Sequence, residues 1–466
     1  MSKYTPRKHR PFDVRREAQR ILQQLEDPEV LVFAAELIDD ADQRHHLSTR
    51  DRRFLTEVTY GVLRQRGTLD AVLAKYAETR LDQLERPVLA ALRIGLYQLL
   101  FLDGIPPFAA VSTAVGLMRR EIHLRRFVNG VLRTIAREMH KVDAALDRGG
   151  ANPTKRLQLT GKVVFFSRAV FTDPGENEIA YLAEVHSYPQ DLVRRWVAQH
   201  GRDRAEQLMR HGNERPVLCV RVNRQRLSLD AVQNELATDG IPSDVIGPVA
   251  LQVKGSASDL LASRAFRSGH LTVQGAFAQQ AIPLLDPKPG TLCVDLCAAP
   301  GGKTTHMAEF TGDRARILAC DVDARRLRRV ITNVRRLRLS GIHPLVVDAT
   351  RPIALRQPAA SVLVDVPCSN TGVLKRRPEA RWRFSPARLA SLVELQRKLL
   401  DAAAPLVAPG GHMLYSTCSI EPEENELRAS SFVTQHAAFR VVTQRSAIPG
   451  ETTDDGGYLA LFEREA

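Results

Sequence analysis

The stretch Asp295–Lys303, Asp-Leu-Cys-Ala-Ala-Pro-Gly-Gly-Lys, constrains the fold more than any other part of the chain. The apolar run 291–296 predicts a short buried strand, and Pro300-Gly301-Gly302 predicts a tight turn. A helix is expected from Thr304 onward. A strand, a glycine turn and a helix N-terminus bring backbone N–H groups up to a ligand, so we expect a binding loop here.

This loop fails two nucleotide-binding patterns. Gly302-Lys303-Thr304 supplies the last three letters of a P-loop, but Cys297 occupies the position of its leading glycine, so the phosphate cradle is incomplete. The loop does not match G-x-G-x-x-G either, which argues against a nicotinamide dehydrogenase. We therefore expect a different ligand.

Strands and helices alternate regularly from about residue 271 onward, which predicts a parallel, doubly wound sheet. Ligands of such sheets bind beyond the C-terminal ends of the strands. A carboxylate closes four of the expected strands, and this repetition indicates one shared site rather than chance helix caps. The strands are 292–296, 317–321, 345–348, 362–365 and 413–417, and the acids are Asp295, Asp321, Asp348 and Asp365.

Two of the six cysteines lie in polar turns directly after expected strands. Cys368 belongs to Asp-Val-Pro-Cys-Ser-Asn-Thr-Gly (365–372), and Cys418 to Tyr-Ser-Thr-Cys-Ser-Ile (415–420). Neighbouring hydroxyls and helix N-termini favour thiolate, the nucleophilic form. Buried cysteine is usually a small hydrophobe, and we interpret Cys219, Cys293 and Cys320 in that way.

These motifs resemble those of the RNA cytosine-5 methyltransferases of the Sun/Fmu and nucleolar-protein (Nop/Nol) group. They occur in the family order over roughly the last 200 residues, and Glu-Pro-Glu-Glu-Asn-Glu (421–426) follows the second cysteine. The resemblance implies a C-terminal α/β, Rossmann-like domain. Its implied activity is methyl transfer from S-adenosylmethionine to C5 of a cytosine in RNA.

The resemblance also implies residue roles. Cys418 adds to cytosine C6 as the nucleophile, Cys368 assists product release, and Asp365 hydrogen-bonds the base. Lys303 faces the same pocket. The implied cofactor-binding set, with Asp321 on the ribose and Asp348 on the adenine, is Cys297, Ala298, Ala299, Pro300, Gly301, Gly302, Lys303, Asp321, Asp348 and Asp365. No metal is expected.

The chain departs from the family pattern near Cys368. Asn370 replaces a usual glycine, Val366 replaces a usual alanine, and Lys-Arg-Arg-Pro-Glu (375–379) lacks the frequent histidine before proline. None of these changes removes a catalytic group. Around Pro422 we interpret the acids as first-turn helix residues with a structural role; they are Glu421, Glu423 and Glu424.

Residues 11–140 show a helical pattern throughout, with a capping signal at Ser48 and a buried helix at 88–102. Asp51-Arg-Arg-Phe54, Leu92–Leu100 and Phe127–Arg133 resemble the NusB-like RNA-binding domain, which narrows the family to bacterial enzymes that modify small-subunit (16S) ribosomal RNA. Such a domain binds RNA or protein, or has a purely structural role.

The remaining segments carry no catalytic motif. Turn formers predict a linker at 141–180, with a short strand at 162–166. Residues 181–270 are expected to form a small α+β module that includes a helix pair at 187–212, and 271–466 the methyltransferase domain.

The net charge of +13 favours nucleic acid as a partner, although a solvated basic surface would also explain it. The best candidates for RNA phosphate contacts are Lys375, Arg376, Arg377, Arg381 and Arg383, whereas the arginine run 325–338 is expected to be a solvated helix face. The cysteine spacing favours neither a disulfide framework nor a zinc site. We expect a cytoplasmic monomer that is not membrane-bound.

Two alternatives stay open at this point. The same chemistry could act on transfer RNA, or the chain could be a non-catalytic RNA-binding factor of ribosome assembly. The intact Cys368, Cys418, Asp365 and Lys303 argue against the second alternative.

Overall fold

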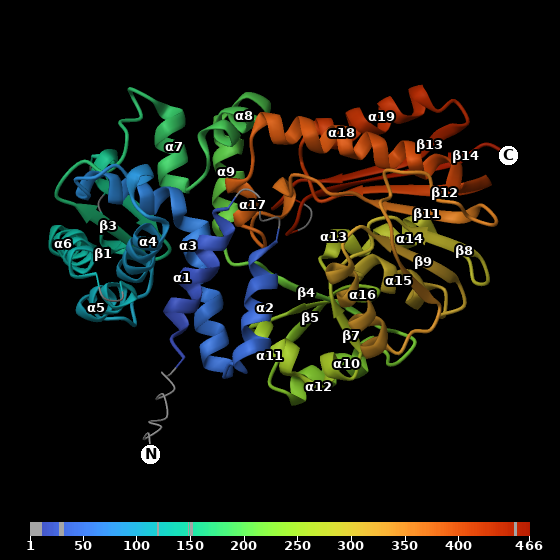
Figure 1. Ribbon diagram of the computed structural model, residues 1–466, viewed down its shortest axis with the longest axis horizontal. Coiled ribbons are helices and arrows are strands. Elements are labelled where there is room, and N and C mark those ends of the chain that lie inside the picture. Colours follow the sequence, from blue (N-terminus) through green and yellow to red (C-terminus); the bar gives the residue numbers. More distant parts are fainter. Residues whose placement is uncertain (1–11, 28–31, 119–120, 148, 150–151, 452–453) are drawn as a thin grey trace, which may run out of the picture. The chain divides into compact units, whose positions relative to one another are not determined.

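The computed structural model describes residues 12–27, 32–118, 121–147, 149, 152–451 and 454–466 (Figure 1). The chain divides into two compact units, residues 1–213 and 214–466. In the described part of the chain, no helix is long and apolar enough to cross a membrane.

Helices that pack around a common apolar core form most of the first unit, as the sequence predicted. Ser48 caps α3 by accepting a hydrogen bond from Asp51 N at 3.1 Å, and prolines lie in the first turns of α4 and α5. The helices are α1 (Val14–Leu25), α2 (Ala34–His45), α3 (Thr49–Tyr76), α4 (Arg86–Phe101), α5 (Pro107–Leu117) and α6 (Ile122–Glu138).

A small antiparallel sheet occupies part of the segment expected to be a linker, which corrects that expectation. Its strands, in the order β1-β3-β2, are β1 (Met139–Asp143), β2 (Arg156–Leu159) and β3 (Lys162–Phe166). The expected strand at 162–166 is confirmed as β3. The sheet is stable because Leu157, Val164 and Phe166 join the helical core, whereas the turn residues between the strands obscured the pattern.

Helices α7 (Glu178–His186), α8 (Gln190–His200) and α9 (Arg202–Asn213) complete the first unit. The helix pair at 187–212, which the sequence grouped with the small module, packs against α7, and α7 contacts α3. Gly67 N donates to Ser187 Oγ at 2.8 Å, and Thr68 Oγ1 donates to the Glu184 carbonyl at 2.6 Å. Both hydrogen bonds join residues more than a hundred positions apart, so periodicity could not reveal them.

The second unit begins with an antiparallel sheet in the order β5-β6-β4-β7, which confirms a small α+β module. Val220, Leu236 and Leu251 belong to its apolar core. Its elements are β4 (Leu218–Val222), α10 (Leu229–Thr238), β5 (Ser243–Gly247), β6 (Ala250–Val253), α11 (Ala257–Ala262), α12 (Arg264–Arg267) and β7 (Leu271–Val273).

The large sheet that follows has the order β10-β9-β8-β11-β12-β14-β13. The strands from β10 to β12 run parallel, whereas β14 is antiparallel to both of its neighbours, so the sheet is mixed rather than purely parallel. A loop without a crossover helix joins the last two strands, and such a connection suits antiparallel pairing. The strands are β8 (Leu292–Asp295), β9 (Arg316–Asp321), β10 (Ile342–Val346), β11 (Ala359–Asp365), β12 (Val407–Thr417), β13 (Phe439–Ala447) and β14 (Gly457–Arg464).

Helices cover both faces of this sheet (Figure 1). One apolar core packs α14, α15 and α16 against the sheet, and a second core packs α18 and α19 against the other face. The helices are α13 (Ala276–Gln279), α14 (Ala281–Leu285), α15 (Gly302–Phe310), α16 (Ala324–Leu337), α17 (Glu379–Trp382), α18 (Pro386–Ala403) and α19 (Glu426–Gln435). The site lies in loops at the C-terminal ends of the parallel strands.

Candidate active site

The carboxylates predicted at the strand ends lie along one edge of the sheet. β8, β9 and β11 end at Asp295, Asp321 and Asp365, and Asp348 follows β10 by two residues. The parallel register pairs Leu363 with Asp295 and places Val346 opposite Asp321. The edge expected from the sequence is therefore formed.

The binding loop 297–301 is held by the strand and helix beside it. Ala298 N donates to the Cys320 carbonyl at 2.8 Å, and Ala299 N donates to Asp321 Oδ2 at 3.1 Å. Gly301 has a φ of 102°, and a Cβ there would lie 3.3 Å from Val330. Glycine is needed because a side chain is strained in this backbone region and the helix leaves little space.

Two residues of α16 also support the loop through hydrogen bonds that no sequence motif indicated. Arg326 Nη2 donates to the Ala299 carbonyl at 3.2 Å, and Asn333 Nδ2 donates to the Pro300 carbonyl at 3.1 Å. Both side chains lie on the helix that was interpreted as a solvated basic face. Their spacing on α16 gave no signal that they would turn toward the loop.

Asp295 is almost completely buried at the base of the loop, with 1% exposure. Thr304 Oγ1 donates to its Oδ2 at 2.7 Å, and Cys297 N donates to Oδ1 at 3.4 Å. Burial, the largest effect, and the nearby negative charge of Asp365 together raise the pKa of Asp295 to about 7, although the Thr304 hydrogen bond acts to lower it. This carboxyl group anchors the start of α15.

Two acids of the expected cofactor-binding set, Asp321 and Asp348, differ in their surroundings. Asp321 is buried and accepts hydrogen bonds from Ala299 N and Asp323 N. Asp348 has a side chain that is 43% exposed and accepts from Thr350 N and Oγ1. Its hydrogen bonds with Thr350 lower the pKa of Asp348.

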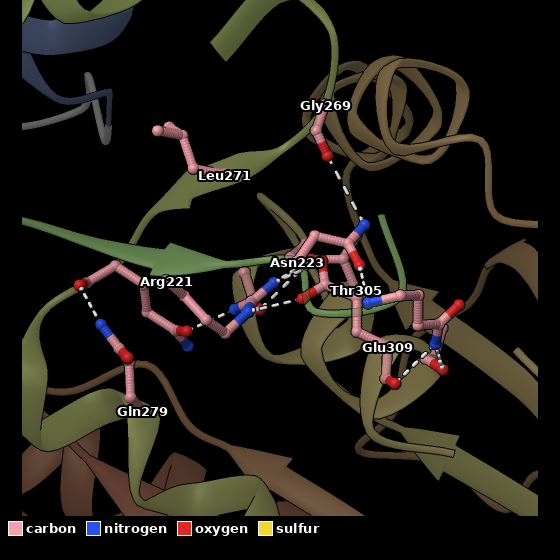
Figure 2. A network of polar contacts seen from close by, with 12 residues as sticks. Arg221, Asn223, Gly269, Leu271, Gln279, Thr305 and Glu309 are labelled. Atoms are coloured by element: carbon pink, nitrogen blue, oxygen red, sulfur yellow. Dashed lines mark hydrogen bonds and ion pairs between the residues drawn. The ribbon is translucent and has the colours of Figure 1, made fainter. Parts of the chain in front are cut away.

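Arg221, on β4, ties the small module to the helix after the binding loop (Figure 2). Its side chain is 1% exposed, and Nε pairs with Glu309 Oε2 on α15 at 2.8 Å. Its guanidinium also donates to the Gly302 carbonyl at 2.9 Å and to Thr305 Oγ1 at 3.1 Å. A buried arginine from the antiparallel module thus holds the first turn of α15, a contact that no sequence motif indicated.

Lys303 and Asp365, predicted to share a pocket, form an ion pair. Lys303 Nζ lies 2.7 Å from Asp365 Oδ1, and the two side chains are 14% and 32% exposed. Lys303 follows the binding loop at the start of α15, whereas Asp365 ends β11. The ion pair joins the expected cofactor loop to the strand that leads to Cys368.

The two cysteines singled out by their motifs lie side by side, with 3.2 Å between the Cys368 and Cys418 Sγ atoms. The hydrogen bond from Cys368 lowers the pKa of Cys418, burial opposes this effect, and the positive charges of Arg377 and Lys303 support it. The same hydrogen bond, burial and the charge of Glu424 raise the pKa of Cys368. The electrostatics therefore favour Cys418 as the thiolate.

Gly372 allows the two cysteine loops to approach closely. Its N–H donates to the Cys418 carbonyl at 3.0 Å. A Cβ at this position would lie 2.7 Å from the backbone of Gly456 and 3.0 Å from the Cys418 carbonyl oxygen. Any side chain would push the loops apart.

Glu424 has a larger part in the site than the sequence indicated. It lies in the short helical turn 422–424, as expected, but it is fully buried. Its carboxylate accepts hydrogen bonds from Ser369 N at 2.9 Å and from Gln396 Nε2 at 2.9 Å. Ser369 Oγ in turn lies 3.0 Å from Ser419 Oγ, so Glu424 links the residues that follow both cysteines.

Two of the five basic residues proposed for RNA phosphate contacts, Lys375 and Arg381, are buried, which corrects the sequence interpretation for them. Lys375 is 4% exposed and pairs with Asp454, and Arg381 is completely buried. Arg376 pairs with Asp455 at 2.9 Å. These charges were predicted to face RNA because the sequence does not show that the distant acidic pair 454–455 folds back onto them.

Comparisons with known proteins agree with this architecture. The family model of the 16S rRNA methyltransferase RsmB/F matches residues 282–459, the NusB family model matches 13–137, and the RsmF/B-like ferredoxin-like domain matches 188–258.

The relatives match most of the length of this chain. The "Probable ribosomal RNA small subunit methyltransferase B" of Synechocystis is 35% identical over 410 residues, covering 86% of this chain and 85% of the relative. The ribosomal RNA small subunit methyltransferase B of Cronobacter sakazakii is 32% identical, covering 90% and 91%. The crystal structure of PH0851 is 28% identical, with a TM-score of 0.78, and covers 98% of this chain and 100% of that one.

The site and the fold together define a methyltransferase of the α/β class with a NusB-like helical domain and a ferredoxin-like module. The chain belongs to the RsmB/F family of 16S rRNA methyltransferases.

Proposed function

We propose that this protein methylates C5 of a cytosine in RNA, with 16S ribosomal RNA as the substrate, through a covalent bond between Cys418 and C6 of the base. The observation that carries the proposal is the pair of cysteines 3.2 Å apart, beside the Lys303–Asp365 ion pair. The names of the relatives, which are ribosomal RNA small subunit methyltransferases B, support the choice of substrate.

S-adenosylmethionine is the methyl donor in this proposal, and the residues present suit it. Gly301 lets the loop turn closely against Val330 of α16, and the buried Asp321 offers carboxylate oxygens at the edge of the sheet. The loop 297–303 would hold the methionine part, Asp321 the ribose and Asp348 the adenine. When bound, the cofactor supplies an electrophilic methyl group.

The cysteines make the base reactive. Cytosine C5 is a weak nucleophile, so the Cys418 thiolate first adds to C6 and turns C5 into an enamine carbon. Asp365, oriented by Lys303, hydrogen-bonds the ring as C6 is attacked. After C5 has gained the methyl group, a base removes the C5 proton, the electrons of that C–H bond form the C5=C6 double bond again, and Cys418 leaves C6 as a thiolate. We assign Cys368 to assist this release because it lies next to the breaking bond.

Substitution of each cysteine tests these roles. Cys418→Ala should abolish methylation, whereas Cys368→Ala should leave enzyme covalently trapped on RNA, visible as a denaturation-resistant complex with labelled RNA. Cys219→Ala serves as the control because Cys219 is a buried cysteine of β4 outside the site. The reverse pattern would exchange the two roles.

The choice of RNA is tested separately. Purified protein should methylate unmodified 16S rRNA in preference to transfer RNA. Faster methylation of transfer RNA would keep the chemistry and change the substrate. Binding of RNA with no methyl transfer to either would point to a non-catalytic assembly factor.

A further inference from the structure

Asn370 makes direct contact with the proposed nucleophile. Its Oδ1 lies 3.3 Å from Cys418 Sγ and accepts a hydrogen bond from Arg377 Nη1 at 2.6 Å. Its Nδ2 donates to the Cys368 carbonyl at 2.7 Å. One amide therefore contacts Arg377 and both cysteine residues.

The partners of this amide fix its orientation. A guanidinium has only donors, so it must face Oδ1, and a carbonyl only accepts, so it must face Nδ2. The side chain is buried and the residue has a φ of 62°, a left-handed conformation that asparagine tolerates. The amide oxygen therefore points toward Cys418 Sγ in a defined geometry.

Arg377 brings a positive charge to this cluster. The titratable groups that face Cys418 are Cys368, Arg377, Asp365 and Lys303, and Glu424 acts on Cys368. Lys303 is already paired with Asp365, which offsets its charge. Arg377 contacts Asn370, which lies against the nucleophile, and the charge of Arg377 lowers the pKa of Cys418 more than the charge of Lys303 does.

We propose that Asn370 and Arg377 act as a pair of positioning residues that aim Cys418 Sγ and keep a positive charge facing it. The inference rests on the proposed role of Cys418 and deepens it. The two side chains are joined by a hydrogen bond of 2.6 Å, so we expect them to act together.

The test is the pH dependence of alkylation of Cys418 by iodoacetamide, with the modified peptide located by mass spectrometry. Arg377→Met removes the charge, and Asn370→Asp keeps the shape but places a negative charge against Sγ. Both changes should raise the pH midpoint of alkylation by about one unit. Arg377→Lys should restore most of the wild-type midpoint because it keeps the charge.

Arg440→Met is the matched control, since Arg440 is an exposed arginine of β13 paired with Glu463. It should leave the midpoint unchanged. Thermal melting identifies a variant that fails to fold. If Arg377→Met fails to fold, Asn370→Asp still tests the inference, because aspartate has nearly the same shape as asparagine.

Unchanged midpoints in folded Arg377→Met or Asn370→Asp protein would overturn the inference. Failure of the proposed function would look different. If Cys418→Ala protein still methylated RNA, Cys418 would not be the nucleophile, yet the alkylation shifts would persist because they report on the thiol alone.

Discussion

At the scale of single residues, the buried Asp295 makes the stability of the folded protein depend on pH. Its carboxyl group is 1% exposed and has a pKa raised to about 7 by burial. The folded state therefore binds this proton more tightly than the unfolded state does, where the pKa is about 4. The resulting stability is complete at acidic pH and is lost as the pH rises through about 7.

Asp295→Asn should remove this pH dependence. The wild-type melting temperature should fall between pH 5 and pH 8 more steeply than that of the variant, by an amount worth at most about 3 kcal/mol. Asp203→Asn, at an exposed position, should behave like wild type. Equal pH responses in wild type and Asp295→Asn would show that Asp295 is ionised throughout this range.

At the scale of elements, the contact of β4 with α15 connects the small module to the binding loop. Arg221→Met leaves Glu309 buried without this partner and frees the Gly302 carbonyl and Thr305 from the guanidinium. Because these residues start the helix after the loop, we expect affinity for S-adenosylmethionine to fall by about tenfold, the equivalent of roughly one lost hydrogen bond to a charged group. Isothermal titration calorimetry measures this affinity.

A variant at a second buried arginine distinguishes an effect on the position of α15 from a general loss of stability. Arg93 of α4 pairs with Glu26 and Asp70 in the first unit. Arg93→Met should lower the melting temperature as Arg221→Met does, because each change leaves a partly or fully buried carboxylate without its arginine partner. Only Arg221→Met should weaken cofactor affinity; equal affinities in the two variants would contradict the positioning role.

The elements that could be predicted from the sequence are those with strong local signals. The strand–turn–helix at 292–310, the cap at Ser48 and the cysteine turns all carry their own pattern of residues. The antiparallel direction of β14 and the sheet at 139–166 depend on pairing between segments, which periodicity does not report. Likewise, the burial of Glu424 and Lys375 depends on partners far along the chain.

At the scale of the whole molecule, the net charge of +13 suits an RNA substrate, but not every basic residue takes part. Lys375 is held in an ion pair with Asp454, so its charge is already neutralised inside the protein. Lys375→Met should lower the melting temperature yet leave the slope of RNA affinity against salt concentration unchanged. If the magnitude of this slope of affinity against salt concentration decreased by about one, Lys375 would be shown to contact a phosphate.

The central claim is methyl transfer to C5 of cytosine in 16S rRNA. Bisulfite sequencing of RNA from cells with and without the gene tests it most directly, because 5-methylcytosine resists conversion. We predict a protected cytosine in 16S rRNA that becomes convertible when the gene is removed and returns with the wild-type gene, but not with Cys418→Ala. An unchanged pattern of protected cytosines would contradict the claim.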